Sequence, residues 1–197
     1  GFALSGRHVV QPVIRGFAAD SHPMVGVEYA NAIGVANDFG GVKYAVSGLP
    51  DGLKVNASTG VISGVPTKAK AYPNVKVTVT SLMSSGYKAT DTLSLAVDSL
   101  PEWAQGRFSG LVNGHMLLMT VGATGKTSGR FTDGITNWTF SASSFASDSQ
   151  TTGNRILVCR AIAKGTYRVG NRTKSTPDEI LEFTLKALPG ILPASSI

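Results

Sequence analysis

Side chains that could act as nucleophiles or bind a metal are scarce in this sequence. Its 197 residues include one cysteine and three histidines, and no two of these have the spacing of a zinc site. Cys159 lies in the apolar run RILVCRAIA, which predicts a buried thiol, because a reactive thiol needs an open and electropositive setting. His115 follows an Asn-Gly pair, where we expect it to flank a turn. A Ser-His-Asp set assembled across the fold stays open, although no Gly-x-Ser-x-Gly elbow occurs. We therefore predict no catalytic residue, no metal site and no cofactor.

Carboxylates are the next candidates, because two of them in one cleft are the minimum for an aspartic peptidase or a glycosidase. The acidic residues are spread thinly, and no Asp-Thr-Gly or Asp-Ser-Gly motif occurs. Asp133 precedes Gly134 and is more simply the first residue of a two-residue turn. Asp178, Glu179 and Glu182 indicate a solvated face. A secreted hydrolase with carboxylates gathered between two domains stays open as an alternative.

The segment GATGKTSG, residues 122–129, contains the Gly-Lys-Thr step of a phosphate-binding loop. That motif also requires a Gly at the position of Thr120, and its loop must open a helix whose N-terminus holds the phosphate. The residues that follow here, TSGRFT, have the character of a strand. We therefore expect a hairpin turn and not a nucleotide site.

Aromatic and basic residues of the second half are the candidates for binding. Trp138 could stack on a sugar ring if it is exposed, and Lys126 and Arg130 could flank such a platform. These three are the predicted binding residues, and the predicted partner is a glycan or another component of a host or envelope surface, including an acidic one. Proteins of the β-sandwich class usually bury tryptophan, so a core position is the favoured interpretation of Trp138, and the platform is its alternative.

The elements that must position these residues are strands. VKVTVT, residues 75–80, and TLSLAV, residues 92–97, alternate apolar and polar residues as half-buried strands do. In the second half, Asn113-Gly114 and Asp133-Gly134 separate apolar runs, which is a strong hairpin signal because both turn residues need a positive φ. The segment EILEFTLKA fits either a closing strand or a short helix. The sequence predicts an all-β protein.

The segment VDSLPEWAQG is the best linker, since it follows a completed strand and carries Pro101. We predict a β-sandwich domain at residues 1–99, an antiparallel meander that forms a small barrel or sandwich at residues 100–188, and a tail at residues 189–197. Two domains of this size can each bury a core without disulfides.

The composition favours an extracellular all-β chain over a helical cytosolic enzyme. Charged residues make up 15% of the sequence, against an average of about 25%, and 23 residues are Gly. The net charge of +6 favours polyanionic partners, but the basic residues are scattered without a run of five, and nucleic acid is not an expected partner. No apolar run approaches the roughly 20 residues of a membrane helix. The chain begins at Gly1 without a signal peptide, which indicates a processed protein or part of a longer one.

Residues 47–67, SGLPDGLKVNASTGVISGVPT, combine many glycines and prolines with regularly placed apolar residues. Pro50 cannot continue a central strand, and Asp51-Gly52 turns the chain. Leu53 and Val55 then return apolar groups to the core before a second turn ends at Gly60. Each Gly and Pro has a backbone role, so this segment predicts a folded corner and leaves no side chain for chemistry.

The same segment resembles the signature of the Ig-like domain family of bacterial surface proteins, Gly-Leu-Pro-x-Gly-Leu followed by Thr-Gly-x-Ile-x-Gly-x-Pro-Thr. The matching residues are Gly48, Leu49, Pro50, Gly52, Leu53, Thr59, Gly60, Ile62, Gly64, Pro66 and Thr67. The resemblance covers residues 20 to 98 and implies a cadherin-like or dystroglycan-like β-sandwich that serves as a spacer or adhesion unit. Some such domains bind Ca²⁺, but Ser81 stands where an Asp could be expected, so we do not expect calcium here.

The second half resembles β-meander modules of bacterial surface proteins, through GRFSGLV, ATGKTSGRF and NWTFSASSF. The most favoured function is therefore a non-enzymatic module of a bacterial surface or secreted protein, which mediates adhesion or recognises a glycan. The secreted hydrolase and a purely structural spacer are the alternatives. The oligomeric state is left open.

Overall fold

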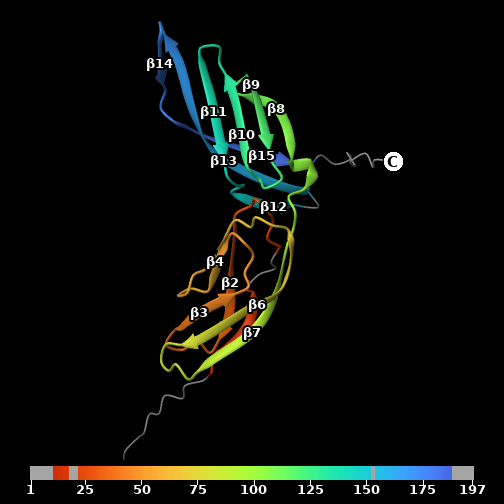
Figure 1. Ribbon diagram of the computed structural model, residues 1–197, viewed down its shortest axis with the longest axis vertical. Helices are drawn as coiled ribbons and strands as arrows, with labels where there is room; N and C mark the ends of the chain where they lie inside the picture. The colour runs from red at the N-terminus through yellow and green to blue at the C-terminus, as the bar shows by residue number, and fades with distance from the viewer. Residues whose placement is uncertain (1–10, 18–21, 152–153, 188–197) are drawn as a thin grey trace, which may run out of the picture. The chain divides into compact units, whose positions relative to one another are not determined.

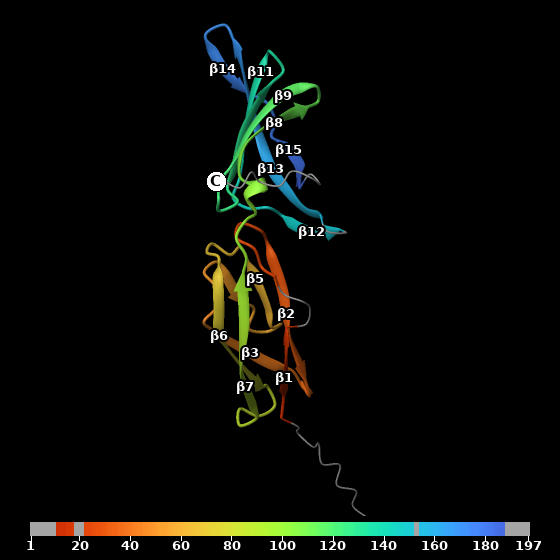
Figure 2. The same ribbon diagram turned by 90° about the vertical axis from the view of Figure 1, so that its right-hand side faces the viewer.

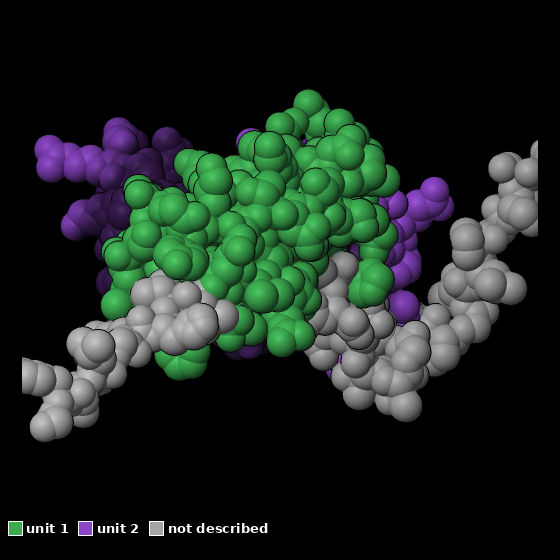
Figure 3. Space-filling view, turned by 90° about the horizontal axis from the view of Figure 1, so that it is seen from below, with its two compact units in different colours: residues 1–23, 29–98 green, residues 24–28, 99–197 purple. Residues whose placement is uncertain are grey.

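The computed structural model describes residues 11–17, 22–151 and 154–187. The chain divides into two compact units, which Figure 3 colours separately: unit 1 contains residues 1–23 and 29–98, and unit 2 contains residues 24–28 and 99–197. The main division lies between Asp98 and Ser99, one residue before the boundary expected from the linker. The predicted tail, residues 189–197, lies outside the described residues.

Unit 1 is a sandwich of two antiparallel sheets, as the all-β prediction required (Figures 1 and 2). The first sheet has the strand order β1-β2-β5-β4, and the second has the order β3-β6-β7. The strands are β1 (Val13–Phe17), β2 (Tyr29–Ala36), β3 (Val42–Ser47), β4 (Leu53–Val55), β5 (Val61–Gly64), β6 (Lys70–Ser81) and β7 (Lys88–Val97).

The core of unit 1 follows from the alternation seen in the sequence. Val75, Val77 and Val79 of β6 are fully buried, while the residues between them face outward or are half-buried. They pack with residues of the opposite sheet such as Ile33 and Ile62. Burial of one such side chain stabilises the fold by about 1.5–3 kcal/mol, so this stripe is a main source of the stability of unit 1.

The corner at residues 47–67 forms as predicted. The Leu53 N–H donates to the Pro50 carbonyl at 3.1 Å, which closes the first turn before β4. Gly52 has φ +94°, and a side chain there would collide with the Val65 carbonyl. Gly60 has φ +70°, and a Cβ there would lie 2.5 Å from the Tyr44 ring. The glycines of this corner are therefore required by backbone conformation and by close packing.

Unit 2 is built on one large antiparallel sheet. Its strand order is β12-β13-β11-β10-β9-β8, and β14 and β15 pair with the long central strand β13. A short 3₁₀ turn at Glu102–Ala104 leads into the first strand. The strands are β8 (Gly106–Val112), β9 (His115–Val121), β10 (Thr127–Thr132), β11 (Thr136–Ala142), β12 (Ser147–Thr151), β13 (Asn154–Val169), β14 (Arg172–Ser175) and β15 (Glu179–Lys186).

The hairpins of unit 2 lie where the turn signals predicted them. Asn113 and Gly114 have φ values of +50° and +82° and connect β8 to β9. Asp133, Gly134 and Ile135 connect β10 to β11, so the hairpin lies at the predicted place, but its turn has three residues and Asp133 does not have the positive φ expected of a two-residue turn. EILEFTLKA forms strand β15 rather than a helix, because its alternating apolar residues pack against the core while it pairs with β13.

A five-residue segment of the first half of the chain, Met24–Glu28, packs within unit 2. Val27 forms a parallel bridge with Phe145, and Met24 and Val27 are only 2% and 3% exposed in the core of that unit. The Phe145 N–H donates to the Gly26 carbonyl at 2.8 Å, and the Glu28 N–H donates to the Phe145 carbonyl at 2.9 Å. The expected domain limits assigned this segment to the first domain.

Within the described part of the chain, none of the helical segments has the length and apolar character that crossing a membrane would require.

Candidate binding surface

The four-stranded meander β8–β11 has one buried face and one exposed face. Because side chains alternate along a strand, every second residue of each strand points away from the core. Leu117 and Met119 of β9 are buried, while Leu118 and Thr120 are exposed. The exposed face of β8–β11 together with β13 is called the outer face below.

The structure places the side chain of Trp138 in the core and not on the outer face. The indole is 8% exposed and stacks on Phe131, its cross-strand partner, with ring centroids 5.7 Å apart and planes 6° from parallel. The interpretation of a core tryptophan is therefore the one that the structure supports, and no exposed stacking platform forms around Trp138. Offset aromatic pairs of this kind stabilise a core beyond their buried area.

Arg130 and Lys126 have different positions. Arg130 lies in the middle of β10 and projects from the outer face, where it is exposed. Lys126 lies in the turn between β9 and β10, and its carbonyl accepts the Gly122 N–H at 2.9 Å. This turn, residues 122–126, leads into a strand as expected, which excludes a phosphate-binding loop of the helical type. Of the three predicted residues, Arg130 lines both grooves described next, Trp138 lines one of them as a buried residue of its floor, and Lys126 lines neither.

The strand register aligns outer-face residues in rows that run across the sheet. One row contains Arg107, Thr120 and Ser128, which are paired from β8 to β9 to β10. The next row contains Leu118, Arg130 and Thr139, which are paired from β9 to β10 to β11.

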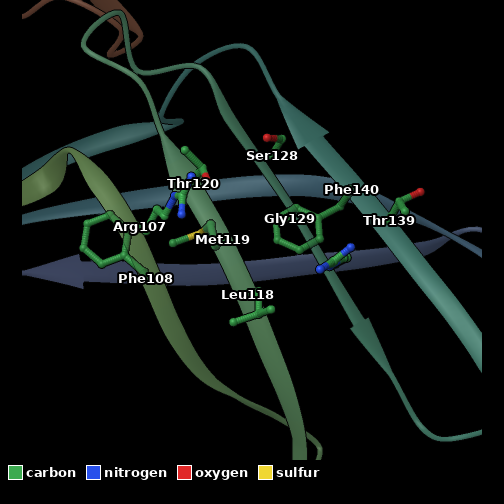
Figure 4. Close-up of a pocket in the computed structure, with 10 residues that line it drawn as sticks. Arg107, Phe108, Leu118, Met119, Thr120, Ser128, Gly129, Thr139 and Phe140 are labelled. Carbon is green, nitrogen blue, oxygen red and sulfur yellow. The ribbon is translucent and has the colours of Figure 1, made fainter.

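A groove of about 700 Å³ is lined by both rows. Its other lining residues, Phe108, Met119, Gly129 and Phe140, form the row that lies between them in the register, so the backbone of that row forms the floor of the groove. Figure 4 shows these residues on four adjacent strands. Short hydroxyl side chains occupy positions between the arginines, which is why the surface is hollowed there.

A second groove of about 560 Å³ lies on the other side of the Leu118–Arg130–Thr139 row. Its far wall contains Met116, Thr132 and Asn137. Arg130 therefore stands between two neighbouring grooves and can donate hydrogen bonds into either. Its guanidinium group offers five N–H donors in a planar fork.

The charge of the outer face is of one sign. Strands β8, β9, β10, β11 and β13 contain no Asp or Glu. Among the described residues, Arg160 is paired with Glu182 at 2.7 Å, whereas Arg107, Arg130 and Lys164 form no salt bridge. These three cations are therefore available to an anionic partner.

The other candidate groups are the possible metal ligands, Cys159 and Asp133. No group of three His, Cys, Asp or Glu side chains among the described residues could hold a metal ion. Burial raises the pKa of Cys159 to about 11, partly offset by a hydrogen bond with Thr127, so its thiol is protonated at neutral pH. The pKa of Asp133 is lowered by hydrogen bonds from the Thr136 and Ile135 N–H groups, at 2.6 and 2.8 Å. A general acid needs the opposite shift.

Sequence reasoning missed most of the lining residues. Arg107, Thr120, Ser128 and Thr139 carry no motif, and they become neighbours only through the register of four strands. The alternation of each strand could have assigned them to the exposed face. Which of them are neighbours across the sheet depends on the register of the strands, which is fixed by the lengths of the hairpin turns. The pattern of a single sequence does not determine a turn length to within one residue.

The comparison with protein-family models agrees with the fold of unit 1. Residues 19–98 match the family model described as "Putative Ig domain". No curated protein matches the chain. Among solved structures, the human desmocollin-1 ectodomain is similar at 14% identity and a TM-score of 0.31, over 94% of this chain and 39% of that one. Ig-like sandwiches are common in extracellular and cell-surface proteins, where they act as binding and adhesion modules. Residues 19–98 are thus similar to this family, and the described part of this range forms an Ig-like β-sandwich.

Proposed function

We propose that the chain is a non-enzymatic module of a secreted or cell-surface protein that mediates adhesion by recognising a glycan, with the outer face of unit 2 as its binding surface. The observation that carries this proposal is the pair of grooves on either side of Arg130, lined by hydroxyl, amide and guanidinium groups. A bacterial surface is the setting that the resemblance of both halves to bacterial modules favours.

The chemistry of the grooves suits sugar rings. Thr120, Ser128 and Thr139 offer hydroxyl groups that both donate and accept hydrogen bonds, as sugar hydroxyls do. Leu118 is 42% exposed and offers an apolar surface for the C–H faces of a ring. Open, shallow grooves with polar walls fit a chain of sugars better than a small apolar ligand, which prefers an enclosed apolar pocket.

The hydrolase alternative lacks comparable support. Among the residues that the structure describes, the two carboxylates whose pKa departs from the ordinary value, Asp51 and Asp133, have it lowered. Asp51 owes this to an exposed ion pair with Lys68 at 2.9 Å. A glycosidase or an aspartic peptidase would need a carboxyl group with a raised pKa near a second carboxyl group. The spacer alternative predicts no specific ligand for the outer face.

A glycan array tests the proposal. The parent chain should bind a defined subset of glycans, and Arg130→Ala should lose most of that signal. The double variant Arg160→Ala/Glu182→Ala is the matched control, because it removes an already paired cation from the same sheet without changing the net charge. Equal binding by the parent and by Arg130→Ala would place the binding surface elsewhere. The absence of any bound glycan would favour the spacer.

A further inference from the structure

Three of the cations of the outer face that form no salt bridge among the described residues lie in a stripe across the sheet. Arg130 and Lys164 lie in the same row, because Arg130 pairs with Thr139 and Thr139 pairs with Lys164. Arg107 lies in the adjacent row on β8. We call Arg107, Arg130 and Lys164 the cationic stripe.

The register gives the spacing of the stripe. Neighbouring strands are about 4.8 Å apart, so the backbones of Arg130 and Lys164, two strands apart, are separated by about 10 Å. Arg107 is two strands from Arg130 and two residues along, which gives a separation of about 12 Å. The stripe therefore spans about 20 Å from β8 to β13, well beyond the size of one sugar ring.

Nothing on these strands neutralises the stripe. The five strands carry no carboxylate, and the described residues provide no salt bridge to any of the three cations. The positions between the cations hold Thr120, Ser128 and Thr139, which are short and uncharged. A ligand lying along the stripe would meet charge at intervals and hydroxyl groups between them.

The same face argues against single-stranded nucleic acid. Proteins that bind single strands present aromatic side chains on which the bases stack. The aromatic residues of β8–β11 lie on the core side, where Phe131, Trp138 and Phe140 are buried. The outer-face residues that line the two grooves include no aromatic side chain exposed for stacking.

We propose that the cationic stripe binds a linear acidic polysaccharide laid across the strands, with anionic groups on at least three of its sugars. This inference rests on the proposed function and names its ligand class. The grooves hold the uncharged parts of the chain, and the three cations hold the charged groups. A terminal acidic sugar alone can reach one cation of the stripe, so the affinity of this site depends on the length of the polysaccharide.

The test uses size-defined heparin oligosaccharides as probes, from disaccharide to octasaccharide, with neutral dextran and a 20-nucleotide single-stranded DNA for comparison. Binding to the full chain is measured by calorimetry at several salt concentrations. Affinity should rise steeply with length until three charges are engaged and then level off. The logarithm of the affinity should fall with the logarithm of salt concentration with a slope of roughly −2, since each engaged charge contributes about 0.7 to 0.9 for a dense polyanion.

Variants assign the effect to the stripe. Arg107→Ala, Arg130→Ala and Lys164→Ala should each weaken hexasaccharide binding several-fold and reduce the salt slope by roughly 0.7. The control Lys43→Ala/Lys54→Ala/Lys76→Ala removes three exposed cations from unit 1 and should retain both affinity and slope. Thermal unfolding of every variant establishes that the exposed substitutions leave the fold intact.

Three results would overturn the inference: equal losses in the stripe variants and the unit 1 control, affinity that does not depend on length, or tighter binding of DNA than of heparin. If the array instead shows Arg130-dependent binding of a neutral glycan, the proposed function stands and the polyanion inference fails. If neither the array nor heparin shows binding, both fail.

Discussion

The segment Met24–Glu28 gives the sharpest stability prediction, because it enters unit 2 through a backbone contact that allows no side chain. Gly26 has φ +75°, and a Cβ there would collide with the Thr124 carbonyl and lie 2.6 Å from the Gly125 Cα. Gly26→Ala must therefore displace the segment, together with the buried side chains of Met24 and Val27.

Gly114→Ala is the matched control. Gly114 also lies in unit 2, with φ +82°, but a Cβ there would meet no atom within 4 Å. The left-handed backbone costs an alanine about 1–2 kcal/mol at either position. At Gly26 the steric overlap adds about 1–3 kcal/mol. We expect unit 2 to lose about 2–5 kcal/mol in Gly26→Ala and about 1–2 kcal/mol in Gly114→Ala.

Tryptophan fluorescence during denaturant unfolding measures this difference. Both tryptophans, Trp103 and Trp138, belong to unit 2, so their emission follows that unit without a contribution from unit 1. A difference of about 2 kcal/mol corresponds to a shift of roughly 8–16 °C in Tm for a unit of this size. If Gly26→Ala is no less stable than Gly114→Ala, the segment does not pack in unit 2 as described, and the reasoning is refuted.

Three further predictions concern single sites. Cys159 should react with a thiol reagent at pH 8 only at the rate at which unit 2 opens, because burial raises its pKa to about 11; fast labelling of the native chain would contradict this. Gly60→Ala should destabilise unit 1, because the added Cβ would collide with the Tyr44 ring. Tyrosine fluorescence or circular dichroism can follow unit 1, and the tryptophan-detected transition of unit 2 should stay unchanged. Asp133→Ala should destabilise unit 2 at neutral pH. Because the pKa of Asp133 is lowered in the folded state, its contribution to stability is present above the ordinary pKa of Asp and is lost as the pH falls through the folded value. The free energies of unfolding of the parent and the variant should therefore converge in acid. A difference that stays constant with pH would contradict the assignment.

Much of the fold could be predicted from local patterns. The alternation of Val75, Val77 and Val79 identified a buried strand face, and the glycines of residues 47–67 identified the corner, because both signals act over a few residues. Asn113-Gly114 located a hairpin for the same reason. Such signals determine which way a side chain faces once the strand itself is known.

The binding surface could be predicted only in part. Arg130 was predicted as a binding residue and lies on the outer face, and its role there stays a prediction. Trp138 was considered beside it as a platform, but Arg130 pairs with Thr139, so the neighbouring Trp138 lies on the opposite, buried face of the sheet. Lys164 joins Arg130 through a register between strands far apart in sequence. The segment Met24–Glu28 pairs with Phe145 through a single parallel bridge and not through a full strand, so its insertion leaves no periodic pattern in the sequence.

The central claim is that the outer face of unit 2 binds the glycan. Titration of the ¹⁵N-labelled chain with the glycan that gives the strongest array signal tests it most directly, by amide chemical-shift mapping. The largest shifts should fall on β8–β11, at Arg107, Thr120, Ser128, Arg130 and Thr139. Shifts confined to the loops of unit 1, with these five amides unmoved, would contradict the claim.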